Sequence, residues 1–363
     1  MPTLAANVVR SCLRIRPDDN VTIFFYPHMT ELAEDIAEEC FRIGADVNLS
    51  VYTDRFYESY LKLLPEENLR KPSVFCRALT EASTAMVWLF GVHDPAMFRR
   101  VPPEKFAAAE EGEALAHLEI ARERKVRSVS VSASLVTRPR AKAYGFSFPR
   151  WQKMVAAASA VPAAKLAADG KRLAALLATA DRVHVTDGRE TDIEFSIRGR
   201  KPFVFDGVVD DEDIATGALE AVIPGGVVAV SAVEDSADGI VSFDVPHAWS
   251  GRTIRKLRWE FRSGRIVSWS GDKNAEVLHR AWEKGVGADK DRIGSVSIGL
   301  NPKAELGFLQ NPIVRGAVSI ATGANDDLGG TTKMAFPHQQ TLRAANLSLD
   351  GKPVVKAGKL LLP

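Results

Sequence analysis

The sequence has few cysteines, almost no net charge and no long apolar run, and each of these absences removes a class of protein. Its 363 residues include three cysteines, Cys12, Cys40 and Cys76, whose spacing matches neither zinc nor disulfide frameworks. Lys and Arg total 47 against 46 Asp and Glu, a formal net charge of +1, which gives no summed field for nucleic acid or a membrane surface. No stretch reaches the roughly 18 apolar residues of a spanning helix. We expect a cytoplasmic protein with a small-molecule partner and neither nucleic-acid nor membrane partners.

The composition that is present is that of an ordinary globular protein, 46% hydrophobic and 26% charged. A chain of this length exceeds one average domain and can bury two cores. We place an N-terminal domain at residues 1–180 and a C-terminal domain at residues 181–363, because the sequence pattern changes there.

The first half alternates apolar runs with amphipathic stretches. VTIFFYP (21–27), VNLSVYT (47–53), STAMVWLFGV (83–92) and VRSVSVSAS (126–134) have the composition of buried strands, and the intervening segments have helical periodicity. Thr30 and Gly44 stand where the first of these helices would start and end. This alternation predicts a Rossmann-like α/β domain with a parallel sheet, and the alanine-rich segment 155–180 predicts one or two helices leading out of it.

The second half consists of short apolar runs separated by Gly, Asp and Ser. RVHVT, DIEFSIRG, GVVAVSAV and GIVSFDV read as strands, and TIRKLRWEFRSGRIVSWSG has the pattern of a hairpin that turns at Ser263-Gly264. The fold class predicted for the whole chain is therefore α/β and α+β, with a parallel N-terminal domain and a mostly antiparallel, β-rich C-terminal domain.

Five segments carry a resemblance to a known family. In chain order they are ADRVHVTDGRETDIEFSIRGRKP, AVIPGGVVAVSAVEDSADG, DRIGSVSIGLNP, RGAVSIATGANDDLGG and LSLDGKPVVKAG. They resemble the second domain of the aminopeptidase T family of metalloaminopeptidases, a scaffold that 2,5-dihydroxypyridine dioxygenase also uses. The resemblance covers nearly the whole chain, and it implies an aminopeptidase T-like fold and a homodimer.

The same resemblance locates the positions of the family's metal ligands, and this chain departs from the pattern at each of them. An acidic ligand would follow the Pro-Gly-Gly turn, where this chain has Val227 and Val228. A glutamate or a nearby histidine would follow the Ile-Gly pair at 293–294, where Ser295 stands. The histidine of the next strand is replaced by Ser319.

The last ligands of the relatives form a His-X-Asp pair seven residues beyond the glycine pair. In ungapped register those positions are Pro337 and Gln339, so that His338 comes one place late and is followed two residues on by Gln340. Zn²⁺ and Fe²⁺ take thiolate, imidazole and carboxylate ligands, usually three or more from the protein. We therefore predict a pocket without a metal or another cofactor.

Two alternatives stay open at this point. The acidic residues outside the lost ligand positions could regroup into a new metal cage; these are Asp210, Asp211, Glu212, Asp326 and Asp327. The chain could also be a pseudoenzyme that binds a small molecule without turning it over.

His93, in GVHDPAM (91–97), follows a predicted parallel strand, where active groups of open α/β sheets are usually found. In the dioxygenase a similar Leu-His-Ser-Pro segment supplies a general base, and the resemblance assigns that role to His93. An imidazole can take a proton from water at neutral pH. Asp94 would orient His93 or simply cap the next turn, and the alternative for His93 is a strand-end histidine bonded to backbone.

The remaining candidates complete the predicted site. His338 is the third catalytic candidate beside His93 and Asp94. His28 would line the pocket or mark a helix entry. The predicted substrate-binding residues are Tyr26, His28, Ser295, Asn301, Ser319, Asn325, Gln339 and Gln340, a polar and mostly uncharged set able to hydrogen-bond a heterocycle or an oxyanion.

The function predicted by elimination is metal-independent hydrolysis of a small, electron-poor heteroaromatic compound. The chain has no Gly-X-Ser-X-Gly elbow and no reactive-cysteine context for a peptidase. A histidine-activated water could displace nitrite, halide or an amine from such a ring, and hydrolysis of a nitroheteroaromatic such as a 2-nitroimidazole is one example. The alternatives are a metal-dependent aminopeptidase or a ring-cleaving dioxygenase of the same fold.

Overall fold

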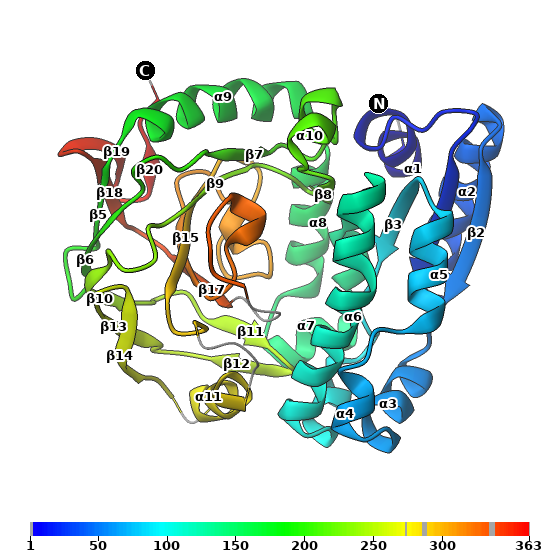
Figure 1. Ribbon diagram of the computed structural model, residues 1–363, viewed down its shortest axis with the longest axis horizontal. Coiled ribbons are helices and arrows are strands. Elements are labelled where there is room, and N and C mark those ends of the chain that lie inside the picture. Colours follow the sequence, from blue (N-terminus) through cyan, green and yellow to red (C-terminus); the bar gives the residue numbers. More distant parts are fainter. Residues whose placement is uncertain (1–2, 273, 285–288, 334–337, 363) are drawn as a thin grey trace. The chain divides into compact units, whose positions relative to one another are not determined.

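The computed structural model describes residues 3–272, 274–284, 289–333 and 338–362. It divides into two compact units, which we call the first unit (Met1–Ser159 and Gly207–Pro224) and the second unit (Ala160–Asp206 and Gly225–Pro363) (Figure 1). The division differs from the single boundary expected at residue 180, because the chain enters the second unit earlier and later returns to the first.

Helix α9 (Ala163–Thr179) accounts for the early crossing. Its apolar face, with Leu166, Leu173 and Leu177, is part of the core of the second unit. Gly170 lies so close to Val204 that a Cβ there would meet a Val204 methyl at 2.3 Å. Of the two alanine-rich helices, only α8 (Phe148–Ser159) belongs to the first unit.

The first unit is a five-stranded, wholly parallel sheet with the strand order β2-β1-β3-β4-β8. Its strands are β1 (Asn20–Phe25), β2 (Asp46–Val51), β3 (Ala85–Leu89), β4 (Arg127–Val131) and β8 (Glu220–Ile223). The α-helices are α1 (Leu4–Ala6), α2 (Thr30–Ile43), α3 (Asp54–Leu63), α4 (Glu66–Leu69), α5 (Val74–Ala82), α6 (Pro103–Arg124), α7 (Arg138–Tyr144), α8 and α10 (Asp211–Thr216). A π-helical segment, η1 (Asn7–Cys12), and three 3₁₀ segments, η2 (Pro27–Met29), η3 (Pro95–Arg100) and η4 (Ser132–Leu135), connect them.

Helix α2 follows from its sequence. Ala33, Ile36, Ala37 and Cys40 recur at helical spacing and pack on the buried strands of the sheet. The helix ends at Gly44, which adopts φ = +100° and bonds back to Cys40 and Phe41, as the sequence predicts.

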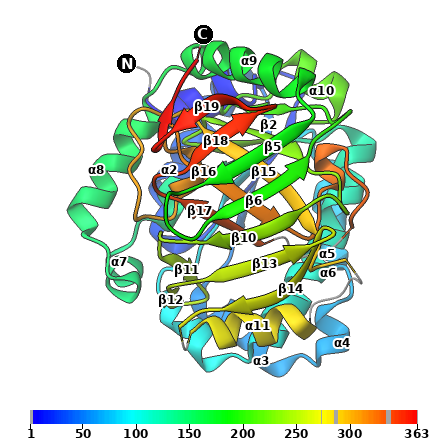
Figure 2. The same cartoon turned by 90° about the vertical axis from the view of Figure 1, so that its left-hand side faces the viewer.

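The second unit is built from two antiparallel sheets and a small hairpin (Figure 2). The eight-stranded sheet has the order β14-β13-β10-β6-β5-β18-β19-β20, with β14 (Arg265–Ser270), β13 (Arg258–Arg262), β10 (Asp238–Ser242), β6 (Asp192–Ser196), β5 (Arg182–Thr186), β18 (Asn346–Leu349), β19 (Lys352–Lys356) and β20 (Lys359–Leu360). The five-stranded sheet has the order β17-β16-β15-β9-β7, with β17 (His338–Leu342), β16 (Val318–Thr322), β15 (Ile293–Gly299), β9 (Val227–Ser231) and β7 (Phe203–Phe205). Strands β11 (His247–Trp249) and β12 (Arg252–Ile254) form the hairpin, and the further helical segments are α11 (Ala275–Lys284), η5 (Asn311–Ile313) and η6 (Asp326–Leu328).

The predicted hairpin at Ser263-Gly264 is confirmed as the turn between β13 and β14. Both residues have positive φ, +47° and +78°, as a two-residue turn between twisted strands requires. The fold class predicted from the sequence is likewise confirmed, since a parallel sheet in one unit accompanies antiparallel sheets in the other.

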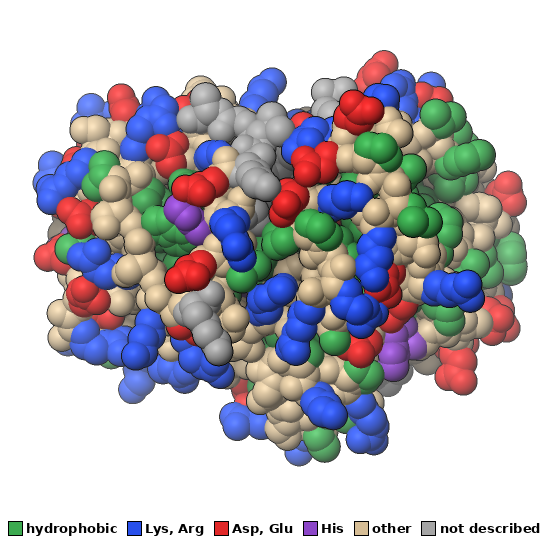
Figure 3. Space-filling view, turned by 90° about the horizontal axis from the view of Figure 1, so that it is seen from below, with side chains coloured by type: hydrophobic (Ala, Val, Ile, Leu, Met, Phe, Trp, Pro, Cys, Tyr) green, Lys and Arg blue, Asp and Glu red, His purple; other side chains and the backbone are tan. Residues whose placement is uncertain are grey.

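The surface agrees with the small net charge. Acidic and basic side chains are interspersed on the face shown in Figure 3. None of the helices within the described residues is both long and apolar enough to cross a membrane.

A buried ion pair joins the start of β4 to the segment before β1. The guanidinium of Arg127 donates to the carboxylate of Asp19 and to the carbonyl oxygens of Leu13 and Arg14, and both charged side chains are less than 10% exposed. Burial alone would raise the pKa of Asp19, but hydrogen bonds from Thr84, Arg127 and the Arg16 amide outweigh it and lower that pKa.

Replacing Arg127 by methionine should lower the free energy of unfolding by about 3–5 kcal/mol, because Asp19 would remain buried without its partner. The pair's contribution should be present above the unfolded pKa of Asp, roughly 3.9, and be lost as the pH falls through the lowered folded pKa. Urea unfolding at pH 7 measures the change. Arg10→Met, which removes the exposed Arg10–Glu39 pair, is the control and should cost less than about 1 kcal/mol.

Candidate functional site

The strand order of the first unit reverses between β1 and β3. The chain passes from β1 outward to β2, then returns across β1 to β3, so the segments after β1 and β3 lead away in opposite directions. In open parallel sheets a crevice forms at such a reversal, at the carboxyl ends of the strands, and ligands bind there. His28 follows β1 and His93 follows β3, and their ring centroids lie 5.3 Å apart.

The main chain of His93 is held by side chains from two other elements. The amides of His93 and Asp94 donate to the two carboxylate oxygens of Asp54, at 2.8 and 3.0 Å, and the hydroxyl of Thr137 donates to the carbonyl of His93 at 2.6 Å. The imidazole of His93 itself is exposed. The backbone is therefore fixed while the ring can reach water or a ligand.

Asp94 caps the 3₁₀ segment that follows. Its carboxylate accepts from the Ala96 amide at 2.9 Å, at the N-cap of η3. Of the two roles considered for Asp94, capping the turn is the one with a contact, and we assign it no catalytic part.

His28 lies in η2, just before α2. Its ring also lies at the point where the strand order of the sheet reverses. Its Nε2 lies 2.9 Å from the carbonyl oxygen of Ser134, so Nε2 carries the proton and donates it. The buried Nδ1 is then an acceptor, and no partner for it is found among the residues that the structure describes. Burial lowers the pKa of His28 despite the bond to Ser134, and the charge of His93 lowers it further.

Tyr26 and Arg140 stand beside the two histidines. Tyr26 is 2% exposed, and its ring centroid is 6.3 Å from that of His28. Arg140, from α7, is buried and donates to the carbonyl oxygen of Val92. Gly91 has φ = +139°, and a Cβ there would meet Leu135 at 2.5 Å and the guanidinium at 3.3 Å.

The polar residues predicted to line the site from the second unit do not share one surface. Strand registers put Ser295, Ser319 and Gln339 on one face of the five-stranded sheet, whereas His338 and Gln340 point to the other face, among the core side chains. Successive side chains of a strand alternate between faces, so the run His338-Gln339-Gln340 cannot act as a single lining.

The first of these faces is rich in hydroxyl groups. Ser319 bonds to Thr341 at 2.8 Å, and the amide nitrogen of Gln339 donates to the Ser297 hydroxyl at 3.0 Å. Ser295 is 6% exposed, and within the described part of the chain its hydroxyl forms no hydrogen bond. This face supplies neutral donors and acceptors but no charge.

The side chains of Asn325 and Asn301 form hydrogen bonds within the protein and stabilise loops. The amide nitrogen of Asn325 donates to Glu234 at 3.0 Å and to the carbonyl of Gly294 at 3.2 Å, and its oxygen accepts from the Thr332 amide at 2.9 Å. Its side chain lies so close to Gly330 that a Cβ there would meet the amide at 2.2 Å. The glycine pair thus shapes a loop that closes around Asn325.

Asn301 holds the Pro-Gly-Gly turn in a similar way. It is fully buried, and its amide donates to the carbonyl of Gly225 at 2.9 Å while its oxygen accepts from the Lys303 amide at 3.0 Å. The expectation that Asn301 and Asn325 line the pocket is corrected on this ground.

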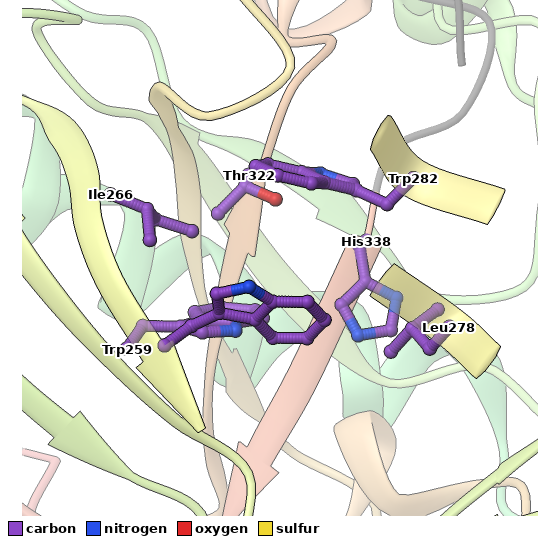
Figure 4. Close-up of a pocket in the computed structure, with 7 residues that line it drawn as sticks. Trp259, Ile266, Leu278, Trp282, Thr322 and His338 are labelled. Carbon is purple, nitrogen blue, oxygen red and sulfur yellow. The ribbon is translucent and has the colours of Figure 1, made fainter. Parts of the chain in front are cut away.

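His338 lines an aromatic pocket of the second unit (Figure 4). The pocket encloses about 10 Å³, room for no more than a water molecule, which is far below the roughly 300–1,000 Å³ of ligand pockets. It is lined by Trp259, Ile266, Trp269, Leu278, Trp282, Thr322 and His338. The amide nitrogen of Gln340 donates to Nε2 of His338 at 3.0 Å, which leaves the proton on Nδ1.

The environment of His338 makes it a poor base. Burial lowers its pKa well below the usual value, and the charge of His247, whose ring stands perpendicular to it at 5.0 Å, lowers it further. Burial also lowers the pKa of His247 to about 4. Both imidazoles are therefore neutral near pH 7, and we assign His338 an apolar packing role instead of a catalytic one.

Several residues of these sites could not be found from the sequence. Asp54 and Arg140 act on the His93 segment from about 40 and 50 positions away, and nothing in their local sequence marks them. Trp259, Trp269 and Trp282 are brought together by β13, β14 and α11. Clustering of three tryptophans within 24 residues was the one available signal.

The fold and site together define a two-part enzyme architecture, an α/β unit with histidines at its strand reversal and a β-rich unit with a polar sheet face. A family model described as thermophilic metalloprotease (M29) matches residues 1–306. The chain therefore belongs to the M29 family of metallopeptidases, a family of hydrolytic enzymes.

Two solved structures are similar in fold. AmpT from Thermus thermophilus has 19% sequence identity and a TM-score of 0.75, covering 99% of this chain and 98% of that one. The 2,5-dihydroxypyridine dioxygenase from Pseudomonas putida KT2440 has 16% identity and a TM-score of 0.65, covering 99% and 96%. No curated protein matches this chain significantly.

The family name implies a metal, and the described residues at the positions that the resemblance assigns to ligands are not suited to hold one. The positions that the resemblance assigns to ligands on β9, β15 and β16 hold Val227, Val228, Ser295 and Ser319, and these strands are neighbours in one sheet. Valine offers no donor, and a neutral hydroxyl is a weak ligand for Zn²⁺ or Fe²⁺. Pro337, the ungapped position of the next ligand, lies outside the described residues.

The alternative cage of acidic residues is not found among the residues that the structure describes either. Asp210 caps α10, where it accepts from the amides of Glu212 and Asp213, in the first unit, whereas Asp326 and Asp327 belong to the second. Across the described residues, no group of three or more His, Cys, Asp or Glu side chains is placed to hold a metal ion.

Replacing His247 by phenylalanine should reduce the acid sensitivity of the protein. Because the pKa of His247 is lowered in the folded state, the unfolded chain binds the extra proton first, and stability is lost as the pH falls from about 6.5 toward 4. The melting temperature of the variant should fall less between pH 7 and pH 5 than that of the wild type. His184→Phe, at a half-exposed site beside Asp192, is the control and should retain the full acid sensitivity.

Proposed function

We propose that the protein is a metal-independent hydrolase that acts on a small, electron-poor heteroaromatic compound. Two features support the proposal: the histidine pair at the strand reversal of the first unit, and the neutral side chains at the family's ligand positions. The neutral side chains are the main support for the proposal, because a metallopeptidase mechanism has no suitable set of metal ligands in the described residues.

The proposed reaction uses His93 as general base. Its imidazole takes one proton from water, and the hydroxide oxygen bonds to the ring carbon that bears the leaving group. The ring accepts the electron pair and then expels the leaving group, such as nitrite or halide, with the pair of the broken bond. The products are a hydroxylated ring, the leaving group as an anion, and one proton that the His93 imidazolium returns to solvent, so atoms and charge balance without an oxidant or a cofactor.

The neighbours of His93 suit this role. Asp54 and Thr137 fix its backbone, so the exposed ring starts from a defined position. His28 presents an Nδ1 that has no partner among the described residues, within the same group of rings, where a ring N–H or a hydroxyl of the substrate could donate to it. Tyr26 supplies an aromatic wall.

Metal-dependent peptidase activity is the second candidate, because the chain belongs to the M29 family and shares the fold of AmpT. It would require a metal held by residues other than those at the family positions. A homodimer and a cytoplasmic location stay predictions from the resemblance and the composition.

Metal analysis separates the two candidates. Protein purified without added metal should contain less than about 0.1 equivalent of Zn, Co and Fe, and turnover of a nitro- or halo-heteroaromatic compound should survive prolonged treatment with EDTA or phenanthroline. The reason is that hydroxyl, amide and aliphatic side chains do not retain these ions. Stoichiometric metal whose removal abolishes activity would establish the metallopeptidase candidate instead.

The His93→Asn variant should lose turnover by about 10²–10⁴-fold, the usual contribution of a general base, while its melting temperature stays within a few degrees of the wild type because the ring is exposed. Steady-state release of nitrite or halide measures the effect. His184→Asn is the matched control on the second unit and should retain full activity. Equal activity in His93→Asn and the wild type would remove His93 from the mechanism.

A further inference from the structure

Arg140 is a deeply buried arginine that has no carboxylate partner. Arg127 and Arg140 are the most buried arginines of the described residues, 7% and 6% exposed. Arg127 forms an ion pair with Asp19, whereas Arg140 forms none with any residue that the structure describes. Charged side chains are almost never fully buried unless they are paired. The charge of Arg140 is therefore not explained by a structural ion pair.

The guanidinium of Arg140 uses only part of its capacity to donate. Its Nη2 donates to the carbonyl oxygen of Val92, and a hydrogen bond joins the side chain to that of Tyr144. Nε is buried and has no partner among the described residues. The charge of Asp54 acts on Arg140, but both oxygens of that carboxylate already accept from main-chain amides. One N–H donor and a positive charge therefore remain for a ligand.

The guanidinium lies at the His93 site because one segment, formed by η4 and α7, contacts both histidines. The carbonyl oxygen of Ser134 lies 2.9 Å from Nε2 of His28, and the hydroxyl of Thr137 donates to the carbonyl of His93 at 2.6 Å. The bond from Arg140 goes to the residue directly before His93. The buried charge is thus fixed beside the exposed imidazole that the proposed mechanism uses as a base.

A second polar atom without a partner belongs to the same site. Nδ1 of His28 is buried, and no partner for it is found among the described residues. The described residues contain three such buried side-chain atoms, and the third, on His247, belongs to the second unit. Because buried polar atoms are nearly always paired, a donor on Arg140 and an acceptor on His28 indicate the place of a ligand.

We propose that Arg140 makes the His93 site selective for a heteroaromatic compound that carries a carboxylate. A guanidinium binds carboxylate oxygens through strong, charge-assisted hydrogen bonds, and the bound carboxylate would neutralise the buried charge. A ring N–H of the same compound would donate to Nδ1 of His28. A phosphate is less suitable, since it brings more charge and more acceptor oxygens than one guanidinium balances. The inference rests on the proposed function and adds the chemical class of its substrate.

Binding of three simple carboxylates tests the proposal: benzoate, pyrrole-2-carboxylate and imidazole-4-carboxylate. Each is compared with its neutral amide by calorimetry on the full chain, and none has a leaving group, so that binding is measured without turnover. At least one carboxylate should bind about tenfold or more tightly than its amide, because only the carboxylate can pair with the guanidinium. No binding by any carboxylate, or equal affinities within all three pairs, would overturn the proposal.

Arg140→Gln should remove this preference, because its side chain is neutral, and the carboxylate should then bind no more tightly than the amide. Arg138→Gln is the matched control on the same helix. Arg138 is exposed and lies over the ring of Phe148 at 4.6 Å, so its loss should leave the preference unchanged. A preference that persists in Arg140→Gln, or that falls equally in both variants, would contradict the role of Arg140.

Arg140→Lys keeps the test decisive if Arg140→Gln does not fold, which its melting temperature would reveal. Lysine retains the positive charge but lacks the planar set of donors. The preference for the carboxylate should therefore be weaker than in the wild type and still present. An unchanged preference, or its complete loss, would count against a charge-assisted bond from the guanidinium.

Turnover separates this inference from the proposed function. For a nitro- or halo-heteroaromatic compound that carries a carboxylate, Arg140→Gln should raise KM about tenfold or more, and for the uncharged parent compound it should change KM little. Carboxylate binding that depends on Arg140, without turnover of any such compound, would retain the anion site and remove the hydrolase. Turnover without any preference for the carboxylate would retain the hydrolase and remove the inference.

Discussion

The reversal of strand order between β1 and β3 is the constraint on which the first unit depends. Because β2 and β3 lie on opposite sides of β1, the loops at that point must part, and side chains that follow the two strands are left facing one another. His28 and His93, 65 positions apart, meet for this reason. No local property of either segment would bring them together.

The sequence predicted the fold well because its signals are periodic and repeated. Alternating runs and helical stripes specify β1, α2 and their neighbours, and Gly44 and Ser263-Gly264 mark turns that need positive φ. The position of His93 after a strand could be predicted for the same reason. The partition of the chain could not, since membership of α9 in the second core depends on a close approach to Val204 that composition does not encode.

The candidate site was harder to predict because side-chain direction and long-range contacts decide it. A one-residue step along β17 moves a side chain from the hydroxyl-rich face to the core, which separates Gln339 from His338 and Gln340. The kind of polar residue also did not distinguish Asn325 from Ser295. The side chain of Asn325 forms hydrogen bonds with Glu234 and with its own loop, whereas the Ser295 hydroxyl forms none with the described residues.

The chain passes from one unit to the other three times, after Ser159, Asp206 and Pro224. One stretch of 18 residues, carrying α10 and β8, therefore belongs to the first unit while both its ends are joined to the second. A fragment made with one new terminus can contain a whole unit only together with part of the other, and one that stopped at residue 180 would leave the edge of β4 without β8. To separate the two units cleanly, the chain would have to be cut at all three crossings.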